Sequence, residues 1–464
     1  MSSVASSRSS SSFRDPAGHI IVEGGLVKRV ITAAGKDDYQ LLMGCGLYQT
    51  LVDRSLMVSH QEERNPAAAD ADAWKVLLPA QVPHVSYAYE WCFEQIKDAA
   101  LLTLEAQKLA LERGMSLKDA SAFNVQFLGP SPVFIDTLSF ERRPPGPWVA
   151  YDQFCRHFLA PLLLMAHVSI RFNRYLQASL DGFPLDLASD LLPRRTYLQL
   201  GPLLHVHLHA RSQKRHQGRR RIGAGRNGFE LSDRRALALI ESLAEAVSHL
   251  RAPQPASAWI DYYRDAAHYP PEAEALKKEA VSTIIRRLSP SLVYDLGGNT
   301  GAYARLATGQ GIRCICYDSD PYCVNQNYLQ SKREGDRQML PLLMDLANPS
   351  PSCGFELRER QDIFERSRPD LVLALALVHH LRITANIPLT NIARFLARLS
   401  PRLLIEFVPR EDPMTQVLLQ GRRSELMDYE ESSFYRAFDS YFELEERTVI
   451  SGTGRTLCLF RRLR

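Results

Sequence analysis

The chain has 464 residues, of which 45% are hydrophobic and 23% are charged. These values are typical of a globular protein with two or three packed domains, and they exclude a fibrous or largely disordered chain. The formal net charge of +4 is small for this length, so the overall charge gives no case for a general nucleic-acid-binding protein.

Cysteine usage and the N-terminal segment bear on the compartment. The eight cysteines form no CxxC pair, which favours reduced thiols over a disulfide framework or a metal site. No apolar run reaches the roughly 20 residues of a membrane span, and the serine-rich N-terminus lacks the apolar core of a secretory signal. We therefore expect a cytoplasmic protein without a membrane span, in which residues 1–13 form a disordered tail. No oligomeric state is predicted.

Residues 14–250 are expected to form an α+β domain, followed by a proline-containing linker at 251–257. Apolar periodicity and turn residues predict strands at 19–22, 26–31, 74–78 and 82–89, and helices at 37–58, 90–113 and 231–250. The stretch 211–228 is rich in Arg and Lys and has no apolar periodicity. It is expected to be a solvated loop rather than an arm that binds RNA or an anionic glycan, because no aromatic residues are interleaved for base stacking.

Three residues in this domain form a spacing that is known from enzymes. Asp119 is followed five residues later by Asn124 and, after a predicted hairpin, by Asp136. This spacing resembles the catalytic loop and metal-binding strand of protein-kinase-like and aminoglycoside or choline kinase-like families. The resemblance implies a kinase-like fold in which Asp119 positions an acceptor hydroxyl while the other two residues hold magnesium with ATP.

The same stretch departs from the kinase pattern. Leu117 stands where these enzymes usually carry His, and Thr137-Leu138 replace the usual Phe-Gly pair. Ordinary turn and hairpin residues are therefore the competing interpretation of the three polar residues.

Residues 258–464 alternate buried runs with helical segments. Five apolar runs separated by helical patterns predict a parallel, doubly wound sheet, with strands at 292–296, 312–317, 339–344, 371–377 and 403–408. The last two runs, 441–450 and 455–460, are separated by a glycine-containing turn that is too short for a crossover helix. They predict a terminal antiparallel hairpin.

The first of these strands ends in a glycine turn with polar residues around it. The turn consists of Asp295, Gly297, Gly298, Asn299 and Gly301. Glycines let a backbone approach a ligand closely, and a following helix would supply free N–H groups.

An aspartate follows each of the next two strands, Asp318 after the second and Asp345 after the third. With the glycine turn and the closing hairpin, this series resembles the class I S-adenosylmethionine-dependent methyltransferases. The resemblance implies S-adenosylmethionine as cofactor, with the glycines under its methionine portion. It further implies that Asp318 accepts from both ribose hydroxyls and Asp345 from the adenine amine.

Candidate catalytic residues lie at the same predicted sheet edge. His379 and His380 follow the fourth strand, and Glu406 lies on the fifth. Methyl transfer is an in-line displacement, so a base is needed only when the acceptor atom keeps its proton. His380 is the candidate base, with Glu406 assisting or binding a substrate amine. The competing interpretation is a His pair that shapes the pocket wall.

The whole chain resembles bacterial methyltransferases of the nodulation protein NoeA-like family. The resemblance rests on the segments 13–16, 117–124, 136–141, 379–381 and 406–409, and it implies a methyltransferase without specifying an acceptor. The leading hypothesis is methyl transfer to a small-molecule or carbohydrate-like acceptor, aided by the N-terminal domain. The alternatives are a bifunctional methyltransferase and phosphotransferase, and a module that binds RNA or an anionic glycan. The terminal hairpin and Asn299 disfavour a nicotinamide dehydrogenase, which also uses a glycine turn.

Overall fold

The computed structural model describes residues 7–9, 11–64, 70–217, 232–254, 270–420 and 428–463. The chain folds as two compact units, one of residues 1–253 with 352–360 and the other of residues 254–351 with 361–464. The segment 352–360 therefore belongs to the first unit although it lies within the C-terminal part of the sequence. No local pattern predicted this.

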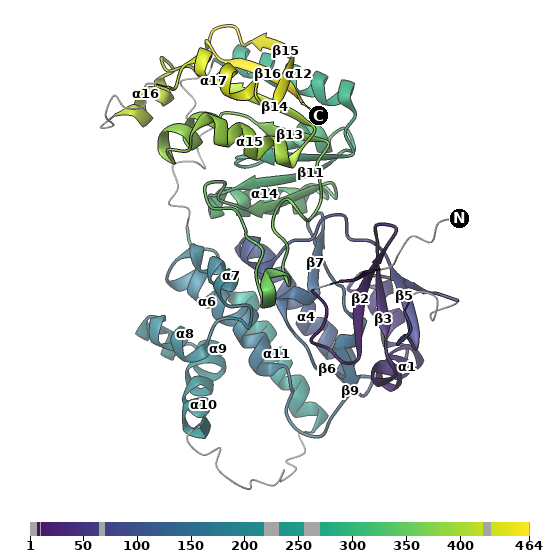
Figure 1. The fold of residues 1–464 in the computed structure, drawn as a ribbon. Helices are drawn as coiled ribbons and strands as arrows, with labels where there is room; N and C mark the ends of the chain where they lie inside the picture. The colour runs from purple at the N-terminus through teal and green to yellow at the C-terminus, as the bar shows by residue number, and fades with distance from the viewer. Residues whose placement is uncertain are drawn as a thin grey trace. The chain divides into compact units, whose positions relative to one another are not determined.

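The first unit opens with an antiparallel sheet in the order β1-β2-β3-β5-β4 (Figure 1). Its strands are β1 (Ser7–Arg8), β2 (Gly18–Glu23), β3 (Leu26–Ile31), β4 (His60–Glu62) and β5 (Lys75–Pro79). Strand β1 differs from the tail expected over 1–13, since it pairs with β2 and covers its open edge. The strand expected at 82–89 is wrong: Pro83 has no N–H for a ladder, and the short β4 pairs with β5 instead.

Helices and two small hairpins make up the rest of this unit. The hairpins pair β6 (Met115–Leu117) with β9 (Phe140–Arg142), and β7 (Val125–Leu128) with β8 (Ser131–Phe134). The helices are α1 (Lys36–Gly44), α2 (Leu47–Asp53), α4 (Phe93–Leu111), α5 (Tyr151–Phe154), α6 (Ala160–His167), α7 (Tyr175–Ala178), α8 (Leu185–Leu191), α9 (Leu200–Pro202), α10 (His209–Gln217) and α11 (Asp233–His249). The single helix expected at 37–58 is divided into α1 and α2, because Gly46 adopts φ +74° between them.

The segment 352–360 is held on this unit by aromatic and ionic contacts. Glu359 forms an ion pair with Arg14 at 2.5 Å, and the ring centroids of Phe355 and Phe13 lie 5.7 Å apart. The guanidinium of Arg360 lies 3.9 Å from the ring centroid of Phe123. These contacts order the segment although it is remote in sequence.

The second unit contains a seven-stranded sheet in the order β12-β11-β10-β13-β14-β16-β15 (Figure 1). Its strands are β10 (Leu292–Leu296), β11 (Arg313–Asp318), β12 (Met339–Leu343), β13 (Leu371–Ala374), β14 (Arg402–Phe407), β15 (Phe442–Val449) and β16 (Thr456–Arg462). The first five are parallel, and β16 is antiparallel to both β14 and β15. The predicted parallel sheet with a terminal hairpin is therefore confirmed.

The strand order reverses beside β10. The chain adds β11 and β12 on one side of this strand and β13 and β14 on the other. In doubly wound sheets, ligands bind in the crevice that such a reversal leaves at the carboxyl ends of the strands. This edge carries the glycine turn.

Helices cover both faces of the sheet and are α12 (Pro271–Leu288), α13 (Ala304–Thr308), α14 (Pro321–Glu334), α15 (Leu389–Leu399), α16 (Pro413–Leu419) and α17 (Glu431–Phe438). Residues of α12 and α13 share a core with Val293 and Leu404, whereas Phe438 of α17 stacks on Phe460. Since successive strand residues alternate faces, Asp295 and Glu406 point to the α12 side. Within the described ranges, no helix has the length and apolarity needed to cross a membrane.

Candidate functional site

A cavity of about 320 Å³ lies at the carboxyl ends of the parallel strands. Its lining includes Gly297 and Asn299 after β10, Asp318 at the end of β11, Asp345 after β12 and His380 after β13. The fold thus brings together residues that are distant in sequence and that the sequence singled out.

The three glycines of the turn have different neighbours. Gly297 adopts φ +74° and borders the cavity. A Cβ on Gly298 would lie 2.4 Å from Cys316 Sγ, and one on Gly301 would lie 2.6 Å from Asn327 Nδ2. Packing behind the turn therefore requires glycine at Gly298 and Gly301, and their predicted contact with a cofactor stays a prediction.

The turn offers few free N–H groups, in contrast to the sequence-based expectation. The amides of Gly297 and Gly298 both donate to Tyr317 O, at 2.8 and 3.0 Å, and the Gly301 amide donates to Gly298 O at 2.8 Å. The Asn299 amide donates to the Asp318 carboxylate. Helix α13 has only five residues and begins three residues beyond the turn. The turn therefore lacks the open set of amides that binds a pyrophosphate.

Asp318 joins the turn to the next strand. Its Oδ2 accepts from the Asn299 amide and its Oδ1 from the Asp320 amide, both at 2.8 Å. Burial raises the pKa of Asp318. An ionised carboxylate has about four acceptor positions, so Asp318 has acceptor capacity beyond these two amides. Asp345 lines the same cavity and accepts from the Ala347 amide at 3.0 Å.

Asp295 lies beneath the turn and is 2% exposed. Burial, followed by the nearby charge of Asp318, raises the pKa of Asp295 to about 7. Its Oδ2 has no hydrogen-bond partner in the structure. A buried acceptor without a donor is unfavourable unless a ligand supplies one.

Glu406 is fully buried in an ionic network under the cavity. Its Oε2 accepts from Lys277 Nζ at 2.6 Å and from the Ala376 amide at 2.8 Å, and Arg455 lies 3.6 Å from Oε1. Ala376 adopts φ +49°, which is unfavourable for a residue with a Cβ. The geometry thus has Glu406 holding the turn after β13, and a substrate amine would have to displace Lys277 to reach this Oε2.

The two histidines have different access. His380 lines the cavity, whereas His379 is 2% exposed and lies behind it, with ring centroids 4.2 Å apart. Burial lowers the pKa of His380 to about 4 and that of His379 well below its usual value. Both rings are neutral near pH 7, so of the pair only His380 has access to accept a proton from a molecule in the cavity.

The candidate kinase-like residues of the first unit form one polar chain. Asn124 Nδ2 donates to Ser139 Oγ at 3.0 Å, and Ser139 Oγ donates to Asp136 Oδ2 at 2.7 Å. Asp119 accepts from the Ser121 amide at 2.9 Å, which is a turn contact. The other oxygen of Asp136 pairs with the guanidinium of Arg29.

This chain does not fit a magnesium site. Arg29 already neutralises Asp136, and the described residues contain no group of three His, Cys, Asp or Glu side chains able to hold a metal ion. Lys28 on β3 pairs with Glu23 and Glu63. A kinase-like fold for this unit stays a prediction. Most of the basic stretch 211–228 lies outside the described residues.

No model of a known protein family matches the chain. The nodulation protein NoeA of Rhizobium meliloti (strain 1021) is 31% identical over 461 residues, which cover 98% of this chain and 96% of that protein. The chain belongs to the NoeA family. The match includes both units of this NoeA-family protein.

Solved structures resemble a smaller part of the NoeA-family chain. The N-methyltransferase NodS from Bradyrhizobium japonicum WM9 is 14% identical, with 42% of this chain and 99% of that chain covered and a TM-score of 0.29. Magnesium protoporphyrin IX methyltransferase from Synechocystis PCC 6803, solved with bound SAH, is 16% identical, with 41% and 86% covered and a TM-score of 0.30.

Two charged residues that lie under the cavity were not predicted from the sequence. Lys277 lies on the buried stripe of α12, four residues after Ala273 and four before Val281. A lysine that interrupts an apolar stripe is a signal that could have been found. Arg455 donates to Asp412 Oδ2 at 2.8 Å and has no comparable signal, because it stands in a polar turn.

Proposed function

We propose that this NoeA-family protein transfers a methyl group from S-adenosylmethionine to a small-molecule or carbohydrate-like acceptor. The observation that carries the proposal is the position of Asp318. Its carboxylate borders the cavity beside the reversal of strand order and accepts from the Asn299 amide of the glycine turn. A carboxylate with spare acceptor positions suits the two hydroxyls of a ribose.

The residues present fit this cofactor better than a dinucleotide. The amides of the turn are bonded within the protein, which disfavours a pyrophosphate. The carboxylates of Asp318 and Asp345 at the cavity wall suit a ligand that carries hydroxyl and amine donors. Asp318 would hold the ribose hydroxyls, Asp345 the adenine amine, and Gly297 would border the methionine portion. When bound, the cofactor supplies an electrophilic methyl group.

The acceptor end of the cavity is formed by the segment after β13. Leu377 and Thr384 line it together with His380, so an acceptor would meet both apolar and polar groups. Such walls orient an acceptor and exclude water, and His380 would take a proton from an acceptor that carries one. We propose that the first unit assists substrate binding.

Equilibrium binding of S-adenosylmethionine tests the cofactor assignment. Asp318→Ala removes the proposed ribose contact, so affinity is expected to fall at least about tenfold, the factor associated with one hydrogen bond to a charged group. Asp370→Asn is the control, because Asp370 accepts from Ser291 and Leu292 at the opposite end of the sheet. Unchanged affinity in Asp318→Ala, or no binding by the wild type, would overturn the assignment.

A further inference from the structure

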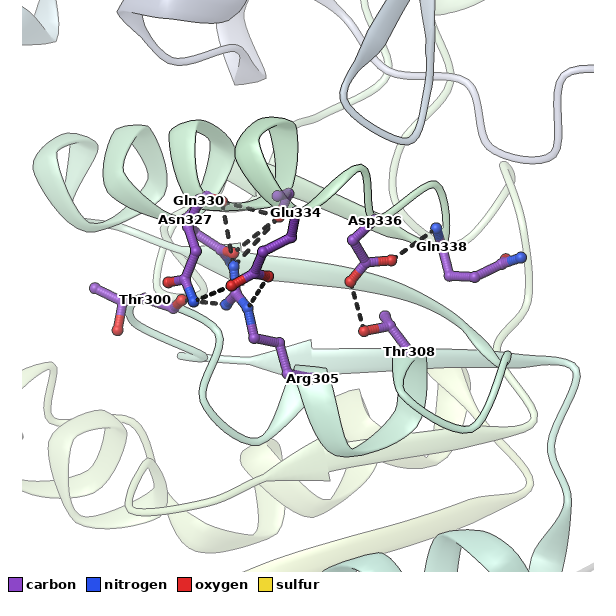
Figure 2. A network of polar contacts seen from close by, with 9 residues as sticks. Thr300, Arg305, Thr308, Asn327, Gln330, Glu334, Asp336 and Gln338 are labelled. Carbon is purple, nitrogen blue, oxygen red and sulfur yellow. Dashed lines mark hydrogen bonds and ion pairs between the residues drawn. The ribbon is translucent and has the colours of Figure 1, made fainter.

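The glycine turn lacks the rigid helix that usually supports such a turn. Helix α13 has five residues, Ala304–Thr308, and isolated helices of this length are unstable. Side-chain contacts with neighbouring elements therefore add to the backbone hydrogen bonds that hold the turn. Figure 2 shows the polar network behind the turn, in which Arg305 extends toward the helix that carries Asn327, Gln330 and Glu334.

Arg305 connects the turn to α14 through separate donors. Its NH1 donates to the Thr300 carbonyl at 2.7 Å, and its Nε donates to Glu334 Oε2 at 3.2 Å. Its NH2 makes longer contacts with Asn327 O at 3.5 Å and Ser331 Oγ at 3.4 Å. A planar guanidinium can satisfy these acceptors at once, whereas a lysine ammonium cannot reproduce the fork.

Gly301 makes this contact sterically possible. It adopts φ +83°, and a Cβ there would lie 2.7 Å from Arg305 NH1 and 2.6 Å from Asn327 Nδ2. The third glycine of the turn thus leaves room for the side chains of Arg305 and Asn327. Gly301 is absent from the lining of the cavity, which agrees with this role.

The contacts of Arg305 with α14 link the glycine turn to the segment that carries Asp318. Helix α14 begins after Asp320, whose side chain caps it by accepting from the Tyr322 amide at 2.8 Å, and the Asp320 amide donates to Asp318. The Thr300 carbonyl is tied to the same helix by Arg305. One element therefore fixes the spacing between the glycine turn and the ribose-binding carboxylate.

We infer that Arg305 is a positioning residue that sets the affinity for the cofactor by holding the glycine turn against α14. The inference rests on the proposed function, since it assigns a role in binding S-adenosylmethionine. Arg305 itself is absent from the cavity lining. Its effect is transmitted from the Thr300 carbonyl along the turn to the Asn299 amide, which donates to Asp318.

A matched pair of contacts supplies the control. Thr308 Oγ1 donates to Asp336 Oδ2 at 2.6 Å, and Asp336 Oδ1 accepts from the Gln338 amide at 3.0 Å. This pair also ties α13 to the segment beyond α14, as Figure 2 shows, but it makes no contact with the glycine turn. Thr308→Val removes it with little change in volume.

The experiment measures binding of S-adenosylhomocysteine, thermal unfolding, and hydrogen exchange of the amides of residues 297–305. Arg305→Lys is expected to weaken binding about tenfold, as for the loss of one charge-assisted hydrogen bond, and to speed exchange in the turn. Thr308→Val is expected to lower the unfolding temperature while affinity and exchange in the turn stay at wild-type values.

Two results would overturn the inference while the wild type still binds. One is wild-type affinity in Arg305→Lys, and the other is an equal loss in Thr308→Val, which would mean general loosening of α13. Absence of binding by the wild type would instead contradict the proposed function.

Discussion

Charged side chains under the cavity are withdrawn from water, and this determines how they titrate. Asp295 and Glu406 are 2% and 0% exposed, and Lys277 is 4% exposed. Burial lowers the pKa of Lys277 and raises that of Asp295. The effect of each group on the stability of the protein can be tested by single substitutions.

The stability of the protein should depend on pH through Asp295. Its pKa in the folded protein is about 7, against 3.8 ordinarily. Between these values the folded state keeps a proton that the unfolded state has released, so stability falls as pH rises through this window. Between pH 5.5 and 8 the wild type should lose on the order of 2 kcal/mol more than Asp295→Asn in urea unfolding. Equal pH dependence of the two proteins would refute this.

Removing one member of the Lys277 and Glu406 pair should be more harmful than removing both. Lys277→Met leaves the buried Glu406 carboxylate with only the more distant cation of Arg455, and loss of the partner costs about 3 to 5 kcal/mol in such buried pairs. The double variant with Glu406→Gln should recover part of that loss, because no charge is then left unpaired. Chemical unfolding of the two single variants and the double variant measures the coupling. A double variant that is less stable than both single variants would count against it.

Substitution of His380 should separate cofactor binding from methyl transfer. His380 lines the cavity and His379 lies behind it, so His380→Gln should leave the affinity for S-adenosylmethionine within about twofold of the wild type. If the acceptor carries a proton, product formation should fall about a hundredfold or more, the range of general base catalysis. Binding calorimetry and product detection on the same preparation give both values. Unchanged product formation would favour the alternative of a pocket wall.

Among the elements, the segment 352–360 is the least expected. It leaves the second unit between β12 and β13 and packs on the first unit, with Arg360 over Phe123, one residue before Asn124. Its contacts are long-range in sequence, so no periodicity could reveal them. The ion pair of Glu359 and Arg14 joins residues 345 positions apart.

Neighbouring arginines in this segment should differ in importance. Arg360→Ala removes the contact with the Phe123 ring and should destabilise the first unit by about 1 kcal/mol. Arg358→Ala is the control, because Arg358 and its ion-pair partner Glu356 are both exposed; an effect within about 0.5 kcal/mol is expected. Unfolding monitored in the first unit distinguishes them. Equal effects would show that the ring contact does not hold the segment.

Across the whole molecule, local patterns predicted the second unit better than the first. All seven strands of the second sheet fall on predicted runs, and the five parallel ones do so because buried parallel strands are apolar throughout. In the first unit, short and partly exposed strands such as β1 and β4 carry no such signal. Their pairing depends on open edges of other strands.

The candidate site was predictable in its outline and not in its internal bonding. Asp318 and Asp345 could be placed because each follows a strand in order. The bonding of the Gly297 amide to Tyr317 O, and the position of Arg305 behind Gly301, could not, because they depend on how side chains from three elements meet. These contacts give Gly298 and Gly301 a packing role that the sequence does not reveal.

The most direct test of methyl transfer is incubation of the protein with methyl-labelled S-adenosylmethionine and a fractionated cell extract. The account predicts label in the small-molecule or carbohydrate fraction with the wild type and none with Asp318→Ala. Label confined to the protein or nucleic-acid fraction, or no labelled product from a wild type that binds the cofactor, would contradict it.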